Sequence, residues 1–222
     1  MQDLIQQERF ELEVLDRMNS ARLLKDLVFG GGTMLRLCYG LERFSVDLDF
    51  WIVKEVDSKS LFKDLKEFLS EYYSMKDAAS KFYTMLFEIR SKSFPRSLKL
   101  EIRKEKKKVS VEQAIAYSRH STIQVLLNVV SLKDMMGSKI GAFLIRKEIR
   151  DIFDIEFLLR RGIPLSAPAD QLQKMLIGIE ALKKRDYTVK LGSIIEEDRR
   201  QYYVKENFKI LRQAIAEKIE LR

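Results

Sequence analysis

Two carboxylates and a glycine turn are the residues of this chain whose types and spacing point most directly to chemistry. Glycines occupy positions 30–32, and the carboxylates Asp47 and Asp49 follow. A glycine turn brings backbone N–H groups close to phosphate oxygens, and carboxylates two residues apart on a strand point to the same face. Carboxylate oxygens with no thiol or imidazole nearby favour Mg²⁺ or Mn²⁺ over zinc. The pattern therefore predicts a metal-dependent phosphate site.

The elements around these residues place them where such a site needs them. Apolar residues alternate with others over 46–53, which predicts a strand with one face on the core and both carboxylates on the opposite face. Residues 27–29 predict a short strand and residues 33–39 a helix, so a phosphate at the glycine turn would meet a helix N-terminus. Either motif alone is common in proteins that bind nothing, whereas the ordered combination is far more specific.

A longer set of residues around these motifs matches a known pattern. The matching residues are Phe29, Gly31, Gly32, Thr33, Tyr39, Gly40, Arg43, Ser45, Asp47, Asp49 and Phe50. This set resembles the AbiEii/AbiGii toxin family of nucleotidyltransferases, a branch of the polymerase-β-like superfamily. Segments 131–139 and 150–154 resemble the Lys motif and the Arg-Asp-x-x-Asp motif of the same family, in the expected order. The resemblance covers about residues 27–160.

The resemblance implies an α+β fold with a polymerase-β-like core, in which helices flank a mixed sheet. We expect residues 1–131 to form this catalytic core, and residues 132–222 to form a helical C-terminal region that completes the active site. Apolar stripes at helical spacing around residues 172–179 and 208–219 support the helical character of that region.

A third carboxylate is expected on a neighbouring strand. Residues 81–89 and 97–103 predict two strands joined by a turn, and 122–130 predicts another. Within 97–103, Glu101 alternates with apolar residues and points away from them. In the superfamily, a third acid on an adjacent strand completes the metal cluster, and Glu101 is the residue we expect there. The alternative is an acid that only offsets its basic neighbours.

The resemblance also implies roles for the individual residues. The expected metal ligands are Asp47, Asp49 and Glu101. The expected nucleotide-binding residues are Gly31, Gly32, Thr33, Arg43, Ser45, Lys139 and Arg150. The expected catalytic residues are Asp47, Asp49, Glu101, Lys139, Asp151 and Asp154. A lysine such as Lys139 suits a phosphate as a point charge, and Asp151 or Asp154 could hold Lys139 or Arg150 in position.

Ordinary explanations exist for the last of these residues. A lysine on a helix is most often solvated, and carboxylates in the first turn of a helix favour the helix dipole without any function. Asp151 and Asp154 are three residues apart and therefore neighbours on one helix face.

Composition agrees with an intracellular enzyme. The chain has 222 residues, one cysteine (Cys38) and one histidine (His120). A single cysteine excludes an internal disulfide and fits a reducing compartment, and a single histidine leaves little material for a Ser-His-Asp or zinc mechanism. No apolar run is long enough to span a membrane, and the polar N-terminus does not read as a signal peptide. We therefore expect a cytoplasmic protein with no membrane partner.

A net charge of +8 raises the expectation of a polyanionic partner. Residues 96–108 contain seven basic and two acidic residues, a local charge of +5. Such a segment either contacts nucleic acid or is a solvated loop.

These observations together predict a nucleotidyltransferase that uses Mg²⁺ or Mn²⁺. An acceptor hydroxyl would attack the α-phosphate of a nucleoside triphosphate (NTP) and release pyrophosphate. The family resemblance implies the toxin of a toxin–antitoxin pair, with a cognate antitoxin as partner and RNA, such as tRNA 3′ ends, as one acceptor class. Transfer to a small molecule or a protein hydroxyl is an alternative, as is a catalytically idle module that binds nucleic acid or an antitoxin.

Overall fold

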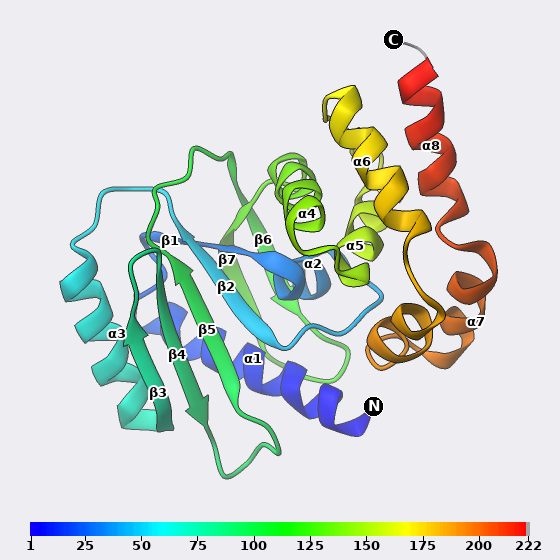
Figure 1. The fold of residues 1–222 in the computed structure, drawn as a ribbon. Helices are drawn as coiled ribbons and strands as arrows, with labels where there is room; N and C mark the ends of the chain where they lie inside the picture. The colour runs from blue at the N-terminus through cyan, green and yellow to red at the C-terminus, as the bar shows by residue number, and fades with distance from the viewer. Residues whose placement is uncertain (221–222) are drawn as a thin grey trace. The chain divides into compact units, whose positions relative to one another are not determined.

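A mixed β-sheet forms the framework of the N-terminal part of the chain (Figure 1). The structure is a computed structural model and describes residues 1–220. The strands are β1 (Leu27–Gly30), β2 (Asp47–Ile52), β3 (Ser74–Ser80), β4 (Thr84–Arg90), β5 (Leu98–Arg103), β6 (Val111–Tyr117) and β7 (Gln124–Val130). They lie side by side in the order β3-β4-β5-β2-β1-β7-β6. Strand β2 pairs antiparallel with β1 and parallel with β5.

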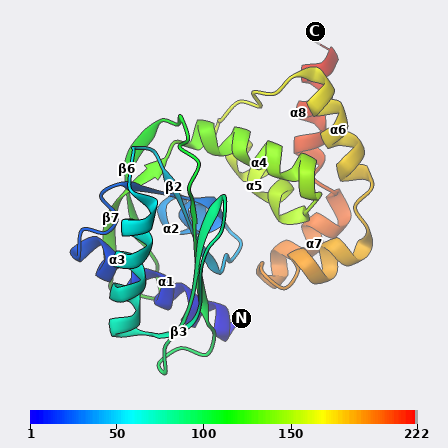
Figure 2. The same cartoon turned by 60° about the vertical axis from the view of Figure 1, so that its left-hand side comes forward.

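Three helices accompany this sheet: α1 (Gln2–Ser20), α2 (Gly31–Tyr39) and α3 (Ser58–Tyr72). Helix α3 packs on β3 and β4, as Figure 2 shows, and there Phe62 stacks on Phe87 with ring centroids 5.0 Å apart. Helix α1 packs on β7, and α2 packs on β1, β2 and β6. A mixed sheet with flanking helices confirms the expected α+β class.

Local sequence signals account for how several of these elements begin. Asp57 precedes α3, and its side chain accepts a hydrogen bond from the Lys59 backbone N–H at 2.9 Å, which satisfies one of the free donors at the helix start. Alternation over 46–53 corresponds to β2, where Leu48 and Phe50 are buried and Asp47 and Asp49 are half-buried. The strand with outward carboxylates is thus confirmed.

Two strands were not predicted from the sequence. Strand β3 and strand β6 lie at the two edges of the sheet. Their side chains are mostly exposed or half-buried, so neither carries a strong alternation of apolar and polar residues. The strand predicted over 81–89 begins only at Thr84, because residues 81–83 form the turn between β3 and β4. The strands predicted over 97–103 and 122–130 are confirmed as β5 and β7.

The chain divides into two units, Met1–Ser131 and Leu132–Arg222. The described part of the second unit is helical, with α4 (Leu132–Arg146), α5 (Ile149–Arg160), α6 (Ala169–Glu180), the π-helix η1 (Asp186–Leu191), α7 (Glu197–Glu206) and α8 (Lys209–Glu220). Helix α4 packs on α5, and α6 packs on α8. Gly162 follows α5 with φ of 80°, a conformation that favours glycine and ends the helix. Within residues 1–220, none of the helices has the length and apolar character that a membrane crossing requires.

Candidate active site

The carboxylates Asp47 and Asp49 lie on the outward face of β2, in the middle of the sheet. In the pairing of β2 with its neighbours, Asp49 lies opposite Gly30 of β1 on one side and opposite Glu101 of β5 on the other. Paired residues on neighbouring strands point to the same face, so Glu101 shares the face of Asp49. Asp47, Asp49 and Glu101 are all half-buried, which leaves their carboxylates partly accessible. Three acids therefore border one surface of the sheet.

The glycine turn packs directly against one of these carboxylates. Gly31 has φ of 75°, and a Cβ atom added to it would lie 2.1 Å from Oδ2 of Asp49. A side chain at this position would therefore meet both backbone strain and a clash with the carboxylate. Glycine at position 31 is what allows the first residue of α2 to lie against Asp49.

The next glycine makes a similar approach to the other motif residues. A Cβ atom added to Gly32 would lie 2.6 Å from Nη2 of Arg43 and 2.8 Å from Oγ of Ser45. Arg43 is only 3% exposed, and its Nη1 donates a hydrogen bond to the carbonyl oxygen of Phe44 at 2.9 Å. The structure therefore brings the start of α2, Arg43 and Ser45 together, although Arg43 lies 11 positions after Gly32 in the sequence.

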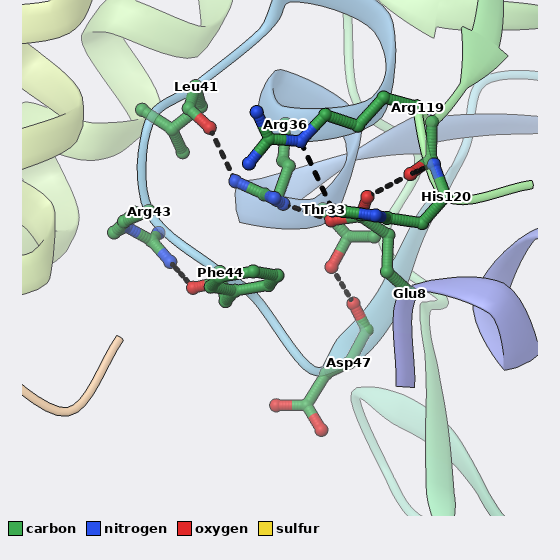
Figure 3. A network of polar contacts seen from close by, with 10 residues as sticks. Glu8, Thr33, Arg36, Leu41, Arg43, Phe44, Asp47, Arg119 and His120 are labelled. Atoms are coloured by element: carbon green, nitrogen blue, oxygen red, sulfur yellow. Dashed lines mark hydrogen bonds and ion pairs between the residues drawn. The ribbon is translucent and has the colours of Figure 1, made fainter. Parts of the chain in front are cut away.

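Thr33 connects the first turn of α2 to the start of β2. Its hydroxyl donates a hydrogen bond to the backbone carbonyl oxygen of Asp47 at 2.6 Å, and its side chain is fully buried. Figure 3 shows the Asp47 carboxylate pointing away from this contact. Thr33 thus fixes the backbone of the carboxylate strand relative to the glycine turn, a role that the sequence analysis did not assign. The expected contact of Thr33 with phosphate stays a prediction.

An ion pair between α1 and α2 supports the loop that carries Arg43 (Figure 3). Glu8 is 4% exposed and accepts hydrogen bonds from Arg36 Nε and from the hydroxyl of Ser118. Arg36 also donates to the carbonyl oxygen of Leu41 at 3.1 Å, and its guanidinium lies 3.8 Å from the centroid of the Phe44 ring. Arg36 therefore contacts the chain on both sides of Arg43, through the Leu41 backbone and the Phe44 ring.

Sequence reasoning missed this ion pair. The available signal is that Gln7, Glu8 and Glu11 fall on the buried face of α1 among apolar residues, and all three are buried. Polar residues inside an apolar helical stripe indicate partners elsewhere in the fold, but the sequence does not say which.

Glu11 is the least solvated of these carboxyl groups. It is fully buried, and neither carboxyl oxygen has a hydrogen-bond partner within the described residues. Burial raises the pKa of Glu11 well above its ordinary value, the charges of Glu8 and Asp47 raise it further, and Arg36 opposes the shift. Burial therefore favours the protonated form of Glu11 in the folded protein.

In the second unit, Lys139 belongs to a buried cluster of charges. Its Nζ lies 2.6 Å from Oδ2 of Asp154 and 3.9 Å from Oδ1 of Asp151. The two carboxylates are fully buried, and the Lys139 side chain is 8% exposed. Lys139 is therefore not a solvated helix lysine, and Asp151 and Asp154 are not exposed acids that only favour the helix dipole. The expected proximity of Lys139 to Asp151 and Asp154 is present.

The arginine that holds Asp151 is Arg146, which the sequence analysis did not select. Arg146 makes two contacts with Asp151, Nε to Oδ2 at 2.6 Å and Nη2 to Oδ1 at 2.5 Å. Arg150, the residue considered for this role, is exposed. The short connection between α4 and α5 turns the chain so that the end of α4 faces the first turn of α5. The motif spacing alone could not reveal this geometry.

Among residues 1–220, no three Asp, Glu, His or Cys side chains are gathered as a ready-made metal cluster, so the ligand role of Glu101 stays a prediction.

Cys38 is half-buried, and burial raises the pKa of its thiol to about 12. A thiol held in its protonated form agrees with a packing role rather than a nucleophilic one.

Comparisons with known proteins agree with this arrangement. Residues 13–219 match the family model described as "Nucleotidyl transferase AbiEii toxin, Type IV TA system". The fold is similar to that of the JHP933 protein from Helicobacter pylori, with a TM-score of 0.55 and 21% identity over 93% of this chain and 94% of that one. A second H. pylori structure, provisionally assigned as a nucleotidyltransferase, has a TM-score of 0.54 and 20% identity over 92% of this chain and 96% of that one. The comparison with curated proteins found no match.

At such identities the two structures speak for the fold alone, whereas the family match extends over nearly the whole chain and includes every motif discussed above. The chain therefore belongs to the AbiEii nucleotidyltransferases, the toxins of type IV toxin–antitoxin systems.

Proposed function

We propose that this nucleotidyltransferase transfers a nucleoside monophosphate from an NTP to a hydroxyl group of RNA, with Mg²⁺ or Mn²⁺ bound by Asp47 and Asp49. The observation that carries the proposal is the contact between the Gly31 backbone and the Asp49 carboxylate. This contact places backbone N–H groups, which suit phosphate, beside an oxygen ligand, which suits a divalent cation.

The residues at the site fit the proposed ion. Asp47 and Asp49 offer oxygen donors, both are half-buried, and they lie two positions apart on the same strand face. Glu101 is the third ligand in the proposal, because it faces the same surface from β5. A bound divalent cation would offset the charge of the triphosphate and lower the pKa of the attacking hydroxyl.

Other residues of the first unit would bind and orient the nucleotide. Gly31, Gly32 and Thr33 would receive phosphate oxygens at the start of α2. Arg43 and Ser45 would lie beside them, since both contact the space that a Gly32 side chain would fill. The buried Arg43 guanidinium supplies a fixed positive charge at this place.

Lys139 is proposed to bind a phosphate of the nucleotide. Its position in the family motif supports this role, and its ion pairs with Asp154 and Asp151 hold the ammonium group in a fixed orientation. Arg146 shares the charge of Asp151, so that Lys139 is not the only cation beside two buried carboxylates. Asp151 and Asp154 would then act through Lys139 rather than on the substrate.

RNA is the proposed acceptor because positive charge borders the carboxylate surface. Lys99 and Arg103 are exposed, and they flank Glu101 on β5 at alternate positions, so they share its face of the sheet. The segment 96–108 is therefore partly a strand next to the site rather than only a solvated loop. A tRNA 3′ end is one acceptor of this class, and the antitoxin of the type IV pair is the expected protein partner.

Labelled nucleotides test this proposal directly. The protein would be incubated with each α-³²P-labelled NTP, Mg²⁺ or Mn²⁺ and total cellular RNA, with the Asp49→Asn variant as the control for contaminating transferases. A labelled species that ribonuclease removes, and that the variant does not form, supports transfer to RNA. Label that survives ribonuclease but is removed by protease, or label on a small molecule, would instead support the other acceptor classes.

A further inference from the structure

Two aromatic side chains stand exposed at one end of the sheet. The turn between β3 and β4 consists of Lys81, Phe82 and Tyr83. Phe82 is 84% exposed and Tyr83 is 70% exposed, and their rings contact each other edge to face with centroids 4.6 Å apart. Single exposed apolar residues are ordinary on a protein surface, but an adjacent pair with this exposure on a tight turn indicates a contact surface.

The turn is anchored to the strand that carries Glu101. The Lys104 backbone N–H donates a hydrogen bond to the carbonyl oxygen of Tyr83 at 2.9 Å, and Thr84 lies opposite Arg103. In Figure 1 the start of β4 accordingly lies beside the arrowhead of β5. Lys104 is three residues beyond Glu101, a distance of roughly 10 Å along a strand. The aromatic pair therefore lies within short reach of the carboxylate surface.

Positive charge surrounds the aromatic pair. Lys81 belongs to the same turn, Lys104 contacts the carbonyl oxygen of Lys81 through its Nζ, and Arg103 is exposed beside them. Arg103 also shares the sheet face of Glu101, because the two residues are two positions apart on β5. Aromatic rings beside lysine and arginine side chains suit a single-stranded nucleic acid, because its bases stack on the rings and its phosphates pair with the cations.

We propose that Phe82 and Tyr83 form a stacking platform for single-stranded RNA, with Lys81, Arg103 and Lys104 binding its phosphates. This platform would hold bases of the acceptor RNA near the C-terminal end of β5, the strand that carries Glu101. The inference rests on the proposed function, since it assigns the acceptor site for the same reaction. Bases in a duplex are already stacked on one another, so the platform favours single strands.

Oligonucleotide binding tests the platform. We expect the double variant Phe82→Ala with Tyr83→Ala to bind a single-stranded oligoadenylate about tenfold or more weakly, because one base–aromatic stack contributes about 5- to 150-fold in affinity. An abasic oligomer of the same length should lose less than about twofold, since it keeps the phosphates but has no bases. The double variant Phe82→Tyr with Tyr83→Phe keeps both rings and should bind like the wild type.

Tyr117→Ala is the matched control, because Tyr117 is an exposed aromatic residue (56%) on the edge strand β6, distant from β4 in the order of the sheet. This variant should bind the oligoadenylate like the wild type. NTP binding and the circular dichroism spectrum should be unchanged in every variant, which separates the platform from the nucleotide site and from folding.

The same variants in the labelling assay separate this inference from the proposed function. If the wild type labels no RNA with any NTP, the acceptor assignment fails and the platform fails with it. If the wild type labels RNA and the Phe82→Ala, Tyr83→Ala protein labels and binds it equally well, only the platform is wrong. Equal loss of affinity for the oligoadenylate and the abasic oligomer would also overturn it. The proposal would likewise be wrong if the Phe82→Ala, Tyr83→Ala protein lost binding only to vesicles of phosphatidylserine and phosphatidylcholine. That result would make the turn a membrane contact.

Discussion

Replacement of Gly31 by alanine should damage both the active site and the stability of the fold. Its φ of 75° is costly for any residue with a Cβ atom, by about 1–2 kcal/mol. The added Cβ would lie 2.1 Å from Oδ2 of Asp49, whereas ordinary contacts begin near 3.4 Å, so the carboxylate or the turn must move by more than 1 Å. Such overpacking costs about 1–3 kcal/mol more, and a 1 Å displacement of a catalytic group costs about 100-fold in rate.

We therefore expect Gly31→Ala to lose about 2–5 kcal/mol of unfolding free energy and about 100-fold in transfer rate. Urea unfolding, followed by circular dichroism, and turnover at saturating Mg²⁺ measure the two effects separately. Gly162→Ala is the matched control, because Gly162 has φ of 80° but no atom within 4 Å of an added Cβ. That variant should show only the backbone cost, about 1–2 kcal/mol, with unchanged turnover.

Wild-type turnover and wild-type Mg²⁺ dependence in Gly31→Ala would show that the clash with Asp49 has no consequence for the site. Equal losses of stability and equal retention of activity in Gly31→Ala and Gly162→Ala would show that only the backbone conformation matters at position 31.

Three further sets of variants probe the carboxylates, the lysine cluster and the buried acid. Asp47→Asn and Asp49→Asn should each remove nearly all transfer and leave the fold intact, because both residues are half-buried on the outer face of β2; turnover near the wild-type value at saturating Mg²⁺ contradicts the assignment. Lys139→Ala should weaken NTP binding and lose about 3–5 kcal/mol of stability, since two fully buried carboxylates lose a cation. The double variant Lys139→Met with Asp154→Asn should recover stability against urea but should not recover NTP binding. Recovery of both stability and NTP binding would mean that the Lys139–Asp154 ion pair is only structural. Burial raises the pKa of Glu11 in the folded state, so as the pH rises the unfolded state loses this proton at a lower pH than the folded state does. The free energy of unfolding therefore falls between the ordinary carboxyl pKa and the raised pKa. Glu11→Gln should remove that fall, so that its gain in melting temperature over the wild type is larger at pH 8 than at pH 5; an equal gain at both values would mean that Glu11 is not protonated in the folded state.

Short-range patterns in the sequence were enough to find the central elements of the candidate site. Alternation over 46–53 identified β2 and the outward direction of Asp47 and Asp49, because side-chain direction on a strand follows from its period of two. The glycine run located the turn before α2. Each of these features depends on residues only a few positions apart.

The contacts that shape the site depend on residues far apart in the chain. Gly31 meets Asp49 only because β1 and β2 pair in the register that sets Gly30 opposite Asp49. Glu8 pairs with Arg36 across 28 residues, and helical periodicity shows that Glu8 is on the buried face without naming its partner. Edge strands such as β3 were missed for a related reason, since pairing with a neighbour rather than local alternation makes them strands.

The cluster around Lys139 separates the two kinds of information most clearly. Spacing placed Asp151 and Asp154 on one helix face, which is a property of the helix itself. Whether Lys139, Arg146 or Arg150 meets each carboxylate depends on the angle at which α4 packs on α5 and on which side chains that packing buries. Packing buries Lys139 beside Asp154, sets Arg146 on Asp151 and leaves Arg150 exposed. Helix periodicity is encoded locally, whereas the choice among nearby charges of the same sign is made by three-dimensional contacts and desolvation.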